Sequence, residues 1–218
     1  MPYLEDAEEL DESGATAQAR EARAERLVTQ ANTLIASAQW EEAAEVLSTA
    51  IALCARPPAA WQVNLANCLC ELSGRTEEAE GHYQAALLSQ QPPSFEVLAN
   101  YALFLSERGA KRQQDALHTL RSALALNPGW AQGQYNLGNL LTSLGAEHEA
   151  EALACYRKAV SADLREADYH NNYALCLSNA GELPLALQHA QRAITLSPNR
   201  VCARSRTLCS AASNFTFI

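Results

Sequence analysis

The feature that most constrains this chain is a short motif that returns every 36 residues. An asparagine is followed by a large apolar residue and then by alanine or glycine, at Asn64, Asn100, Asn136 and Asn172. A weaker copy lies upstream, with Thr29 where the asparagine would stand. A period of this length is typical of helical arrays, in which each copy is one supersecondary unit that buries its apolar faces against its neighbours.

Glycine and proline follow the same period. A glycine stands nine or ten residues after each asparagine, whereas Ala38 takes this place in the first copy; the glycines are Gly74, Gly109, Gly145 and Gly181. Prolines fall near the ends of four copies, at Pro58, Pro93, Pro128 and Pro198. Glycine suits the left-handed residue that closes a helix, and proline cannot continue one. Each copy is therefore predicted to hold two helices, with a turn at the glycine.

The apolar residues between these marks have helical spacing. Each predicted second helix carries two alanines seven residues apart, and these are Ala43 and Ala50, Ala79 and Ala86, Ala116 and Ala123, Ala152 and Ala159, and Ala186 and Ala193. Small residues at fixed places let neighbouring helices approach closely. Two copies have about two extra residues after Gly109 and Gly145, for which we expect a longer turn or an extra half-turn.

These marks together resemble the tetratricopeptide repeat. The match is close for NLGNLL at 136–141 followed by Ala152, Tyr156 and Ala159, and for NYALCL at 172–177 followed by Ala186, Ala193 and Pro198. The resemblance implies an all-α, right-handed α-solenoid of about five helix-turn-helix repeats over residues 24–198. The predicted repeats are about 24–57, 58–93, 94–128, 129–163 and 164–198.

Both ends of the chain lie outside this predicted array. Residues 1–23 are acidic and are expected to be partly disordered or to extend the first helix. Residues 199–218 are expected to form a cap or a disordered tail. The formal net charge of −9 argues against nucleic acid or an anionic membrane as partner, because both require clustered Lys and Arg. Seven cysteines without a recognisable secretion signal indicate reduced thiols in an intracellular, cytoplasmic protein.

Catalysis is not indicated by any motif in the sequence. His82, His118 and His189 fall on predicted second helices, whose outward faces we expect to be wet, and His170 is expected to pack in the core. No glycine-rich phosphate loop, metalloprotease motif or nucleophile elbow is present. We therefore expect a protein that is not an enzyme and has no catalytic residue, cofactor or metal.

The asparagines are the candidate functional residues. The resemblance implies that the first helices line a concave groove, and that the amides form an asparagine ladder similar to that of the tetratricopeptide scaffold of O-GlcNAc transferases. Asparagine has a lower helix propensity than alanine, by about 0.5–0.7 kcal/mol, and its amide can both donate and accept hydrogen bonds to a peptide backbone. The predicted peptide-binding residues are Asn64, Asn100, Asn136, Asn172, Asn67, Asn139 and Asn32. Two alternatives stay open: the amides bond between neighbouring helices, or they face water.

The charge of the groove favours a neutral or basic peptide. The residues just before the ladder position are not basic; they are Val28, Val63, Ala99, Tyr135 and Asn171. Neighbouring places are acidic instead, at Glu25, Glu71, Glu96, Glu107 and Asp168. We expect a scaffold or adaptor that binds an extended peptide segment. The alternatives are a structural, self-assembling protein that uses its convex face and ends, and a regulatory part of a larger enzyme such as a glycosyltransferase. The sequence predicts neither the partner nor the oligomeric state.

Overall fold

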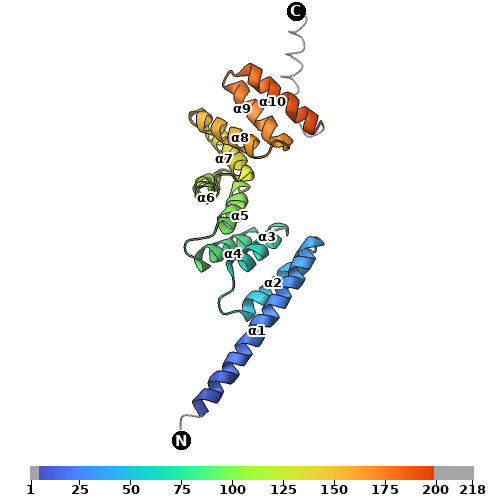
Figure 1. The fold of residues 1–218 in the computed structure, drawn as a ribbon, viewed down its shortest axis with the longest axis vertical. Coiled ribbons are helices and arrows are strands. Elements are labelled where there is room, and N and C mark those ends of the chain that lie inside the picture. The colour runs from blue at the N-terminus through green and yellow to red at the C-terminus, as the bar shows by residue number, and fades with distance from the viewer. Residues whose placement is uncertain (1–4, 199–218) are drawn as a thin grey trace, which may run out of the picture. The chain divides into compact units, whose positions relative to one another are not determined.

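The computed structural model describes residues 5–198, and within them the chain is all-α, without a strand, as predicted. The predicted cap or tail at 199–218 lies outside these residues. The helices are α1 (Glu5–Ala36), α2 (Trp40–Leu53), α3 (Ala59–Cys70), α4 (Thr76–Ser89), α5 (Phe95–Ser106), α6 (Gln113–Leu126), α7 (Ala131–Leu144), α8 (Glu149–Ala162), α9 (Ala167–Asn179) and α10 (Leu183–Leu196). They follow one another as five helix pairs (Figure 1).

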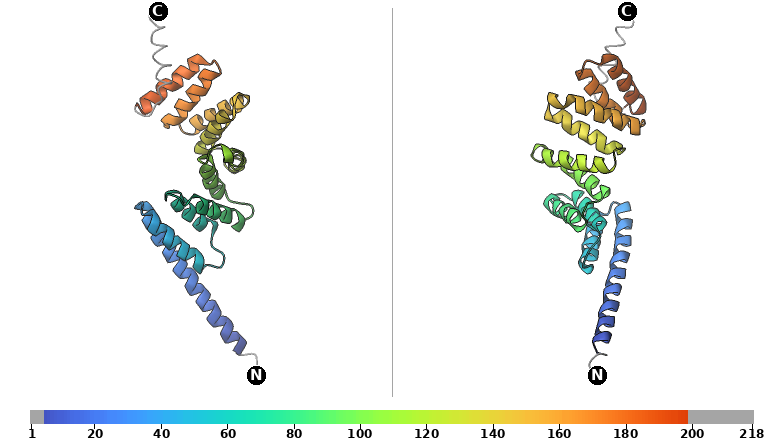
Figure 2. Two further views of the ribbon diagram at one scale, coloured as in Figure 1. Left: turned by 180° about the vertical axis from the view of Figure 1, so that it is seen from behind. Right: turned by 60° about the vertical axis from the view of Figure 1, so that its left-hand side comes forward.

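The chain divides into two compact units, Met1–Val97 and Leu98–Ile218. In the first unit α1 packs on α2, α2 on α3 and α3 on α4. In the second unit α7 packs on α8, α8 on α9 and α9 on α10, and α6 also contacts α7. Figure 2 shows the last two pairs side by side from two further directions. Helix α1 has 32 residues and α2 has 14, so α1 continues past its partner toward the N-terminus (Figure 1).

The turns within the pairs have the backbone conformation that the glycines predicted. Gly74, Gly109, Gly145 and Gly181 all have positive φ angles, and so does Ala38, at 56°. A non-glycine residue in this left-handed region carries steric strain between its Cβ and the backbone. The extra residues after Gly109 and Gly145 form short 3-10 helices, Ala110–Arg112 and Ala146–His148, so the prediction of an extra part-turn is confirmed.

The core is built on the repeated alanines. All ten alanines predicted on the second helices are fully buried. The large side chains between them are buried as well, including Leu47, Tyr83, Leu120 and Tyr156. Small residues let the two helices of a pair approach, and a large residue fills the remaining space. Stability therefore comes from stacking small and large side chains in alternation.

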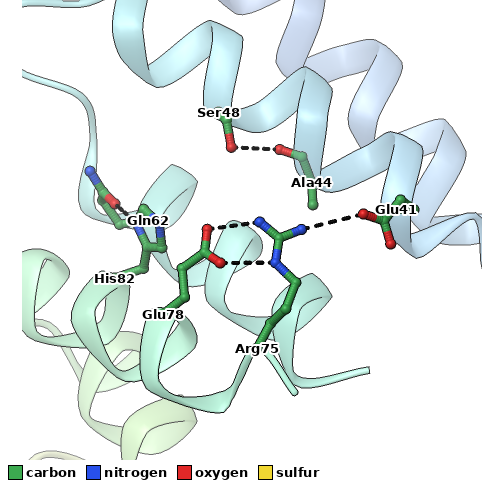
Figure 3. A network of polar contacts seen from close by, with 7 residues as sticks. All are labelled: Glu41, Ala44, Ser48, Gln62, Arg75, Glu78 and His82. Carbon is green, nitrogen blue, oxygen red and sulfur yellow. Dashed lines mark hydrogen bonds and ion pairs between the residues drawn. The ribbon is translucent and has the colours of Figure 1, made fainter. Parts of the chain in front are cut away.

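A polar network at the surface of the first unit joins two helix pairs (Figure 3). Arg75 lies at the start of α4 and forms two hydrogen bonds of 2.8 Å with the carboxylate of Glu78. Its third nitrogen lies 3.5 Å from a carboxylate oxygen of Glu41 on α2. The hydrogen bonds from Arg75 lower the pKa of Glu78, because they favour the ionised carboxylate. The half-buried guanidinium thus connects successive second helices through two exposed carboxylates.

Candidate functional site

A groove lies along the first helices of the second unit. Its volume is about 650 Å³, and it is lined by residues of α5, α6 and α7. Leu103, Leu105 and Leu140 supply its apolar lining, and the polar lining includes Asn136 and Asn139. These two predicted site residues are one turn apart on α7, so they lie on the same face of that helix.

The side-chain oxygen of Asn139 is fully used within the protein. It accepts a hydrogen bond of 2.8 Å from the buried hydroxyl of Tyr156 on α8. It also accepts one of 2.8 Å from Nδ2 of Asn172 on α9. An amide oxygen has two acceptor sites, so none is left for a ligand.

Both N–H bonds of the Asn172 side chain are also used within the protein. Its Nδ2 donates to Asn139 and, over 3.1 Å, to the hydroxyl of Tyr135. Its oxygen accepts a hydrogen bond of 2.9 Å from Nδ2 of Asn171. The open alternative of bonding between neighbouring helices is thus what the structure has at this position of the ladder.

Asn136 differs from Asn172 because the preceding repeat has no amide side chain at the position that would bond with it. The place that would pair with it in the preceding repeat, three residues after Asn100, is Leu103. Its oxygen instead accepts a hydrogen bond of 3.1 Å from Gln132, one turn back on α7. Gln132 in turn accepts one from the hydroxyl of Tyr169 on α9, over 3.1 Å.

The two asparagines of the groove therefore offer mainly donors. Within residues 5–198, the NH₂ groups of Asn136 and Asn139 have no hydrogen-bond acceptor from the protein. Together the two amides keep all four N–H bonds, and three of their four acceptor sites are occupied. The sequence predicts that each amide can pair with both an N–H and a C=O of a peptide; at Asn139 the oxygen is occupied within the protein and only the NH₂ group is available.

The predicted site residues of the first unit form a similar but separate arrangement. Nδ2 of Asn64 on α3 donates to the oxygen of Asn32 on α1, over 3.4 Å. The hydroxyl of the buried Tyr83 donates to the oxygen of Asn67. Asn67 and Asn139 thus hold the tyrosine of their own repeat. Asn100, the remaining predicted residue, is half-buried on α5 in the second unit.

Several groove residues were not predicted from the sequence. Glu107, which the sequence did predict, is exposed in the groove lining and supplies a negative charge. Gln132 and Gln113 were missed; Gln113 also lines the groove, and its Nε2 donates to Ser143 over 3.1 Å. The position of Gln132 four residues before Asn136 is the signal that would have found it, because residues at this spacing meet on a helix.

Two histidines lie differently from the prediction. His82 and His189 are half-buried rather than solvent-exposed, and each contacts the first helix of its own pair. His82 hydrogen-bonds Gln62 over 2.7 Å (Figure 3), and His189 hydrogen-bonds His170 over 2.8 Å. The prediction that His170 packs in the core is confirmed, because it is buried. Burial lowers the pKa of all three imidazoles, which favours their neutral form.

The thiols of the second unit are not activated. All cysteines in the described part of the chain are free, as expected for reduced thiols. Burial raises the pKa of Cys155 and Cys176 to about 11, so both stay protonated near neutral pH and are poor nucleophiles. Between residues 5 and 198 there is no group of three or more metal-binding side chains. In the same part of the chain, no helix has the length and apolar content to cross a membrane.

The paired helices, the left-handed turns and the buried alanines define the class of this protein, an all-α helical repeat. The chain belongs to the tetratricopeptide repeat family, whose model matches residues 28–94 and 146–201. Proteins of this family generally mediate protein–protein interactions and are generally not enzymes. A search of curated protein sequences found no match.

Solved structures of low sequence identity share the fold. PilF of Pseudomonas aeruginosa is 22% identical, with a TM-score of 0.73 over 87% of this chain and 82% of that one. MamA of Desulfovibrio magneticus RS-1 is 19% identical, with a TM-score of 0.70 over 82% of this chain and 97% of that one. YrrB, described as a TPR protein with an unusual peptide-binding site, is 20% identical, with a TM-score of 0.64 over 86% of this chain and 90% of that one.

Proposed function

We propose that this chain is a protein-interaction scaffold that binds an extended peptide segment in the groove of its second unit. The observation that carries the proposal is the pair of amide groups on Asn136 and Asn139 whose N–H bonds find no acceptor within residues 5–198, in a groove with an apolar lining. Unpaired donors beside apolar surface favour a ligand that supplies carbonyl oxygens and buries side chains. The peptide-binding site described for YrrB supports the same kind of function on this fold.

The proposed partner is neutral or basic in the segment that enters the groove. Glu107 places a carboxylate in the lining, and no lining residue of the described groove is basic. An anionic peptide would be repelled by this negative charge, whereas a Lys or Arg side chain would form an ion pair with it. This also argues against the capture of an acidic chaperone tail.

The energies predict weak binding. Four N–H groups that donate to a ligand contribute about 2–6 kcal/mol, at about 0.5–1.5 kcal/mol for each hydrogen bond. Ordering each residue of a flexible peptide costs about 1–2 kcal/mol. Contacts with Leu103 and Leu140 and the attraction of Glu107 must supply the remainder, so the expected dissociation constants are on the order of micromolar.

A peptide-array screen with Asp substitutions tests this proposal. Asn136→Asp and Asn139→Asp keep the oxygens that accept from Gln132, Tyr156 and Asn172, but replace the NH₂ groups in the groove with oxygens. The wild type is expected to select a set of peptides that the double variant loses. Asn127→Asp makes the same chemical change at an exposed position at the end of α6 and serves as the control for charge. Selected peptides that bind the double variant and the wild type equally well would contradict the proposal.

The alternative of a self-assembling structural protein gives a different result. Sedimentation at several concentrations would then show concentration-dependent assembly, and the array would select no peptide that depends on the two asparagines.

A further inference from the structure

The groove of the second unit has a counterpart one repeat further along the chain. A second pocket, of about 360 Å³, lies where α7 ends and α8 begins. Four of its lining residues each stand 36 residues after a residue that lines the groove: Thr142, Gly145, Glu149 and Asn179 follow Ser106, Gly109, Gln113 and Ser143. Two successive repeats therefore build the same pocket, at the edge where their turn glycines lie.

A third cavity lies between the groove and the second pocket. Its volume is about 270 Å³. It shares Asn139 and Ser143 with the groove, and it shares Asn179 with the second pocket. The three cavities thus follow α5, α7 and α9 in order within the second unit, so one extended segment can contact all of them.

The groove and the second pocket each contain one acidic side chain. Glu107 lies in the groove and Glu149 in the second pocket, and none of the three cavities is lined by Lys, Arg or His. Among residues 5–198 neither of these two carboxylates forms an ion pair, whereas the nearby second-helix acids Glu78, Asp115 and Glu151 are each paired with an arginine. Glu149 is also half-buried, so solvent screens its charge less than on open surface.

The arginines nearest to Glu107 in the sequence contact other groups. The guanidinium of Arg108 lies over the ring of Phe104, with its central carbon 4.4 Å from the ring centroid. Arg112 forms an ion pair with Asp115 over 3.0 Å. Neither arginine lines the groove, so the charge of Glu107 faces a ligand there.

We propose that the second unit binds a segment of a partner protein that carries two basic side chains, one for the groove and one for the second pocket. In the groove the aliphatic stem of a Lys or Arg packs along Leu103 and Leu140 while its charged end reaches Glu107. The other basic side chain reaches Glu149. This inference rests on the proposed function, because it specifies the charges of the peptide that lies in the same groove.

The repeat limits the spacing of the two basic residues. Equivalent places on packed neighbouring helices are separated by about 8–10 Å. In an extended segment, side chains two or four residues apart point to the same side, and these spacings span about 7 and 13 Å, on either side of that separation. Adjacent side chains point to opposite sides, so two adjacent basic residues cannot serve both pockets.

Four fluorescein-labelled decapeptides of Gly, Ala and Ser are the probes. One carries a single arginine, one carries two adjacent arginines, and two carry arginines spaced by two or by four residues. Fluorescence polarisation with the full chain at low salt measures the affinities. One of the spaced peptides is expected to bind about threefold or more tightly than the adjacent pair, which has the same charge, because it gains a second ion pair.

Matched variants assign this gain to the second pocket. Glu149→Gln places there the amide that Gln113 supplies in the groove, and it should reduce the spaced peptide to the affinity of the adjacent pair. Glu182→Gln removes the same charge from an exposed position at the start of α10 and should leave the gain unchanged.

Three outcomes overturn the inference: no measurable binding of either spaced peptide, equal affinity of the spaced and adjacent pairs, or a gain that persists in Glu149→Gln. The peptide array distinguishes these failures from failure of the proposed function. Array peptides that depend on Asn136 and Asn139 but bind Glu149→Gln as they bind the wild type would leave the proposed function intact and remove only the role of the second pocket.

Discussion

At the residue scale, the oxygen and the nitrogen of the Asn139 side chain have different roles. Its oxygen binds Tyr156 of its own repeat and Asn172 of the next one, while its nitrogen lies in a groove where the described residues offer it no acceptor. The oxygen is therefore structural, and the nitrogen is the proposed contact to a ligand. Substitutions that remove one atom and keep the other separate these roles.

The first prediction concerns the stability of Asn139 variants. Asn139→Ala removes the acceptor of the buried Tyr156 hydroxyl and should lower the free energy of unfolding by about 1–3 kcal/mol. Asn139→Asp keeps both acceptor bonds and should stay within about 1 kcal/mol of the wild type. Urea denaturation followed by circular dichroism measures both changes. Equal destabilisation by the two substitutions would show that the oxygen is not what stabilises the fold.

A second prediction follows from the turn at Ala38. Its φ angle of 56° places an L-residue in the left-handed region, at a cost of about 1–2 kcal/mol. Ala38→Gly should therefore raise the free energy of unfolding by about 0.5–1 kcal/mol, after the greater flexibility of glycine in the unfolded chain is subtracted.

Gly181→Ala is the matched control for this turn. Its φ is 84° and a Cβ added at this position would meet no atom within 4 Å, so the change is purely conformational. It should destabilise the protein by about 0.5–1 kcal/mol, because the lower flexibility of alanine in the unfolded chain offsets part of the strain. Unfolding midpoints in urea compare the two variants. An Ala38→Gly protein that is less stable than the wild type would contradict the argument.

The sequence predicted the turn glycines, but it did not predict which asparagine of the ladder has an available NH₂ group. The glycine positions follow from the period, because a left-handed turn has few alternatives to glycine. The available NH₂ group of Asn136 does not follow from the period alone. It depends on the residue three places after the preceding ladder asparagine, which is an amide at Asn139 but a leucine at Leu103. Comparing the copies at that place would have separated Asn136 from Asn172.

At the element scale, a histidine pair helps to hold α9 against α10. Nδ1 of His170 and Nδ1 of His189 are 2.8 Å apart, and Nε2 of His170 lies 3.3 Å from the carbonyl oxygen of Leu164. With Nε2–H of His170 donated to that carbonyl, Nδ1 of neutral His170 accepts the hydrogen bond from His189. The equivalent contact in the first unit is made by Gln62 and His82. Sequence periodicity placed His82 and His189 on the correct helices but not on the correct faces, because it does not report which polar partner lies opposite.

The third prediction is a loss of stability in mild acid. Burial lowers the pKa of His170 and His189 in the fold, whereas histidine in an unfolded chain titrates near pH 6.5. Below about pH 6.5 the unfolded chain therefore binds more protons than the folded one, and the free energy of unfolding falls until the folded pKa values are reached. The urea midpoint should be lower at about pH 5 than at about pH 7.5.

His170→Gln tests which group causes this loss. It creates the glutamine–histidine pair that Gln62 and His82 already form, so the drop between the two pH values should be smaller than in the wild type. His118 is exposed, and His118→Gln should keep the full wild-type drop. A drop that is the same in all three proteins would assign the pH dependence to other groups.

At the scale of the whole molecule, the repeat period and the compact units do not coincide. The 36-residue spacing runs unbroken from Asn64 to Asn172, while the chain divides at Val97 and Leu98. A period gives the size and number of helix pairs, and both agree with the structure. It does not locate the division between units, because spacing along the chain does not report how tightly successive pairs contact each other.

This division confines the proposed function to the second unit. The ladder is not one uniform surface, since Asn64 and Asn172 are bonded to neighbouring helices and the NH₂ group of Asn136 has no acceptor among residues 5–198. Binding is expected at Asn136, because Leu103 replaces the amide of the preceding repeat and leaves the Asn136 NH₂ group without an acceptor among the described residues. The central claim is therefore that the side-chain NH₂ groups of Asn136 and Asn139 contact the ligand directly.

Nuclear magnetic resonance of the ¹⁵N-labelled protein tests that claim most directly. Each asparagine NH₂ group gives its own pair of signals, which single Asp substitutions assign. Titration with a peptide selected by the array should shift the signals of Asn136 and Asn139 and leave that of Asn64 in place. A bound peptide that shifts the signal of Asn64 and leaves those of Asn136 and Asn139 unmoved would contradict the account.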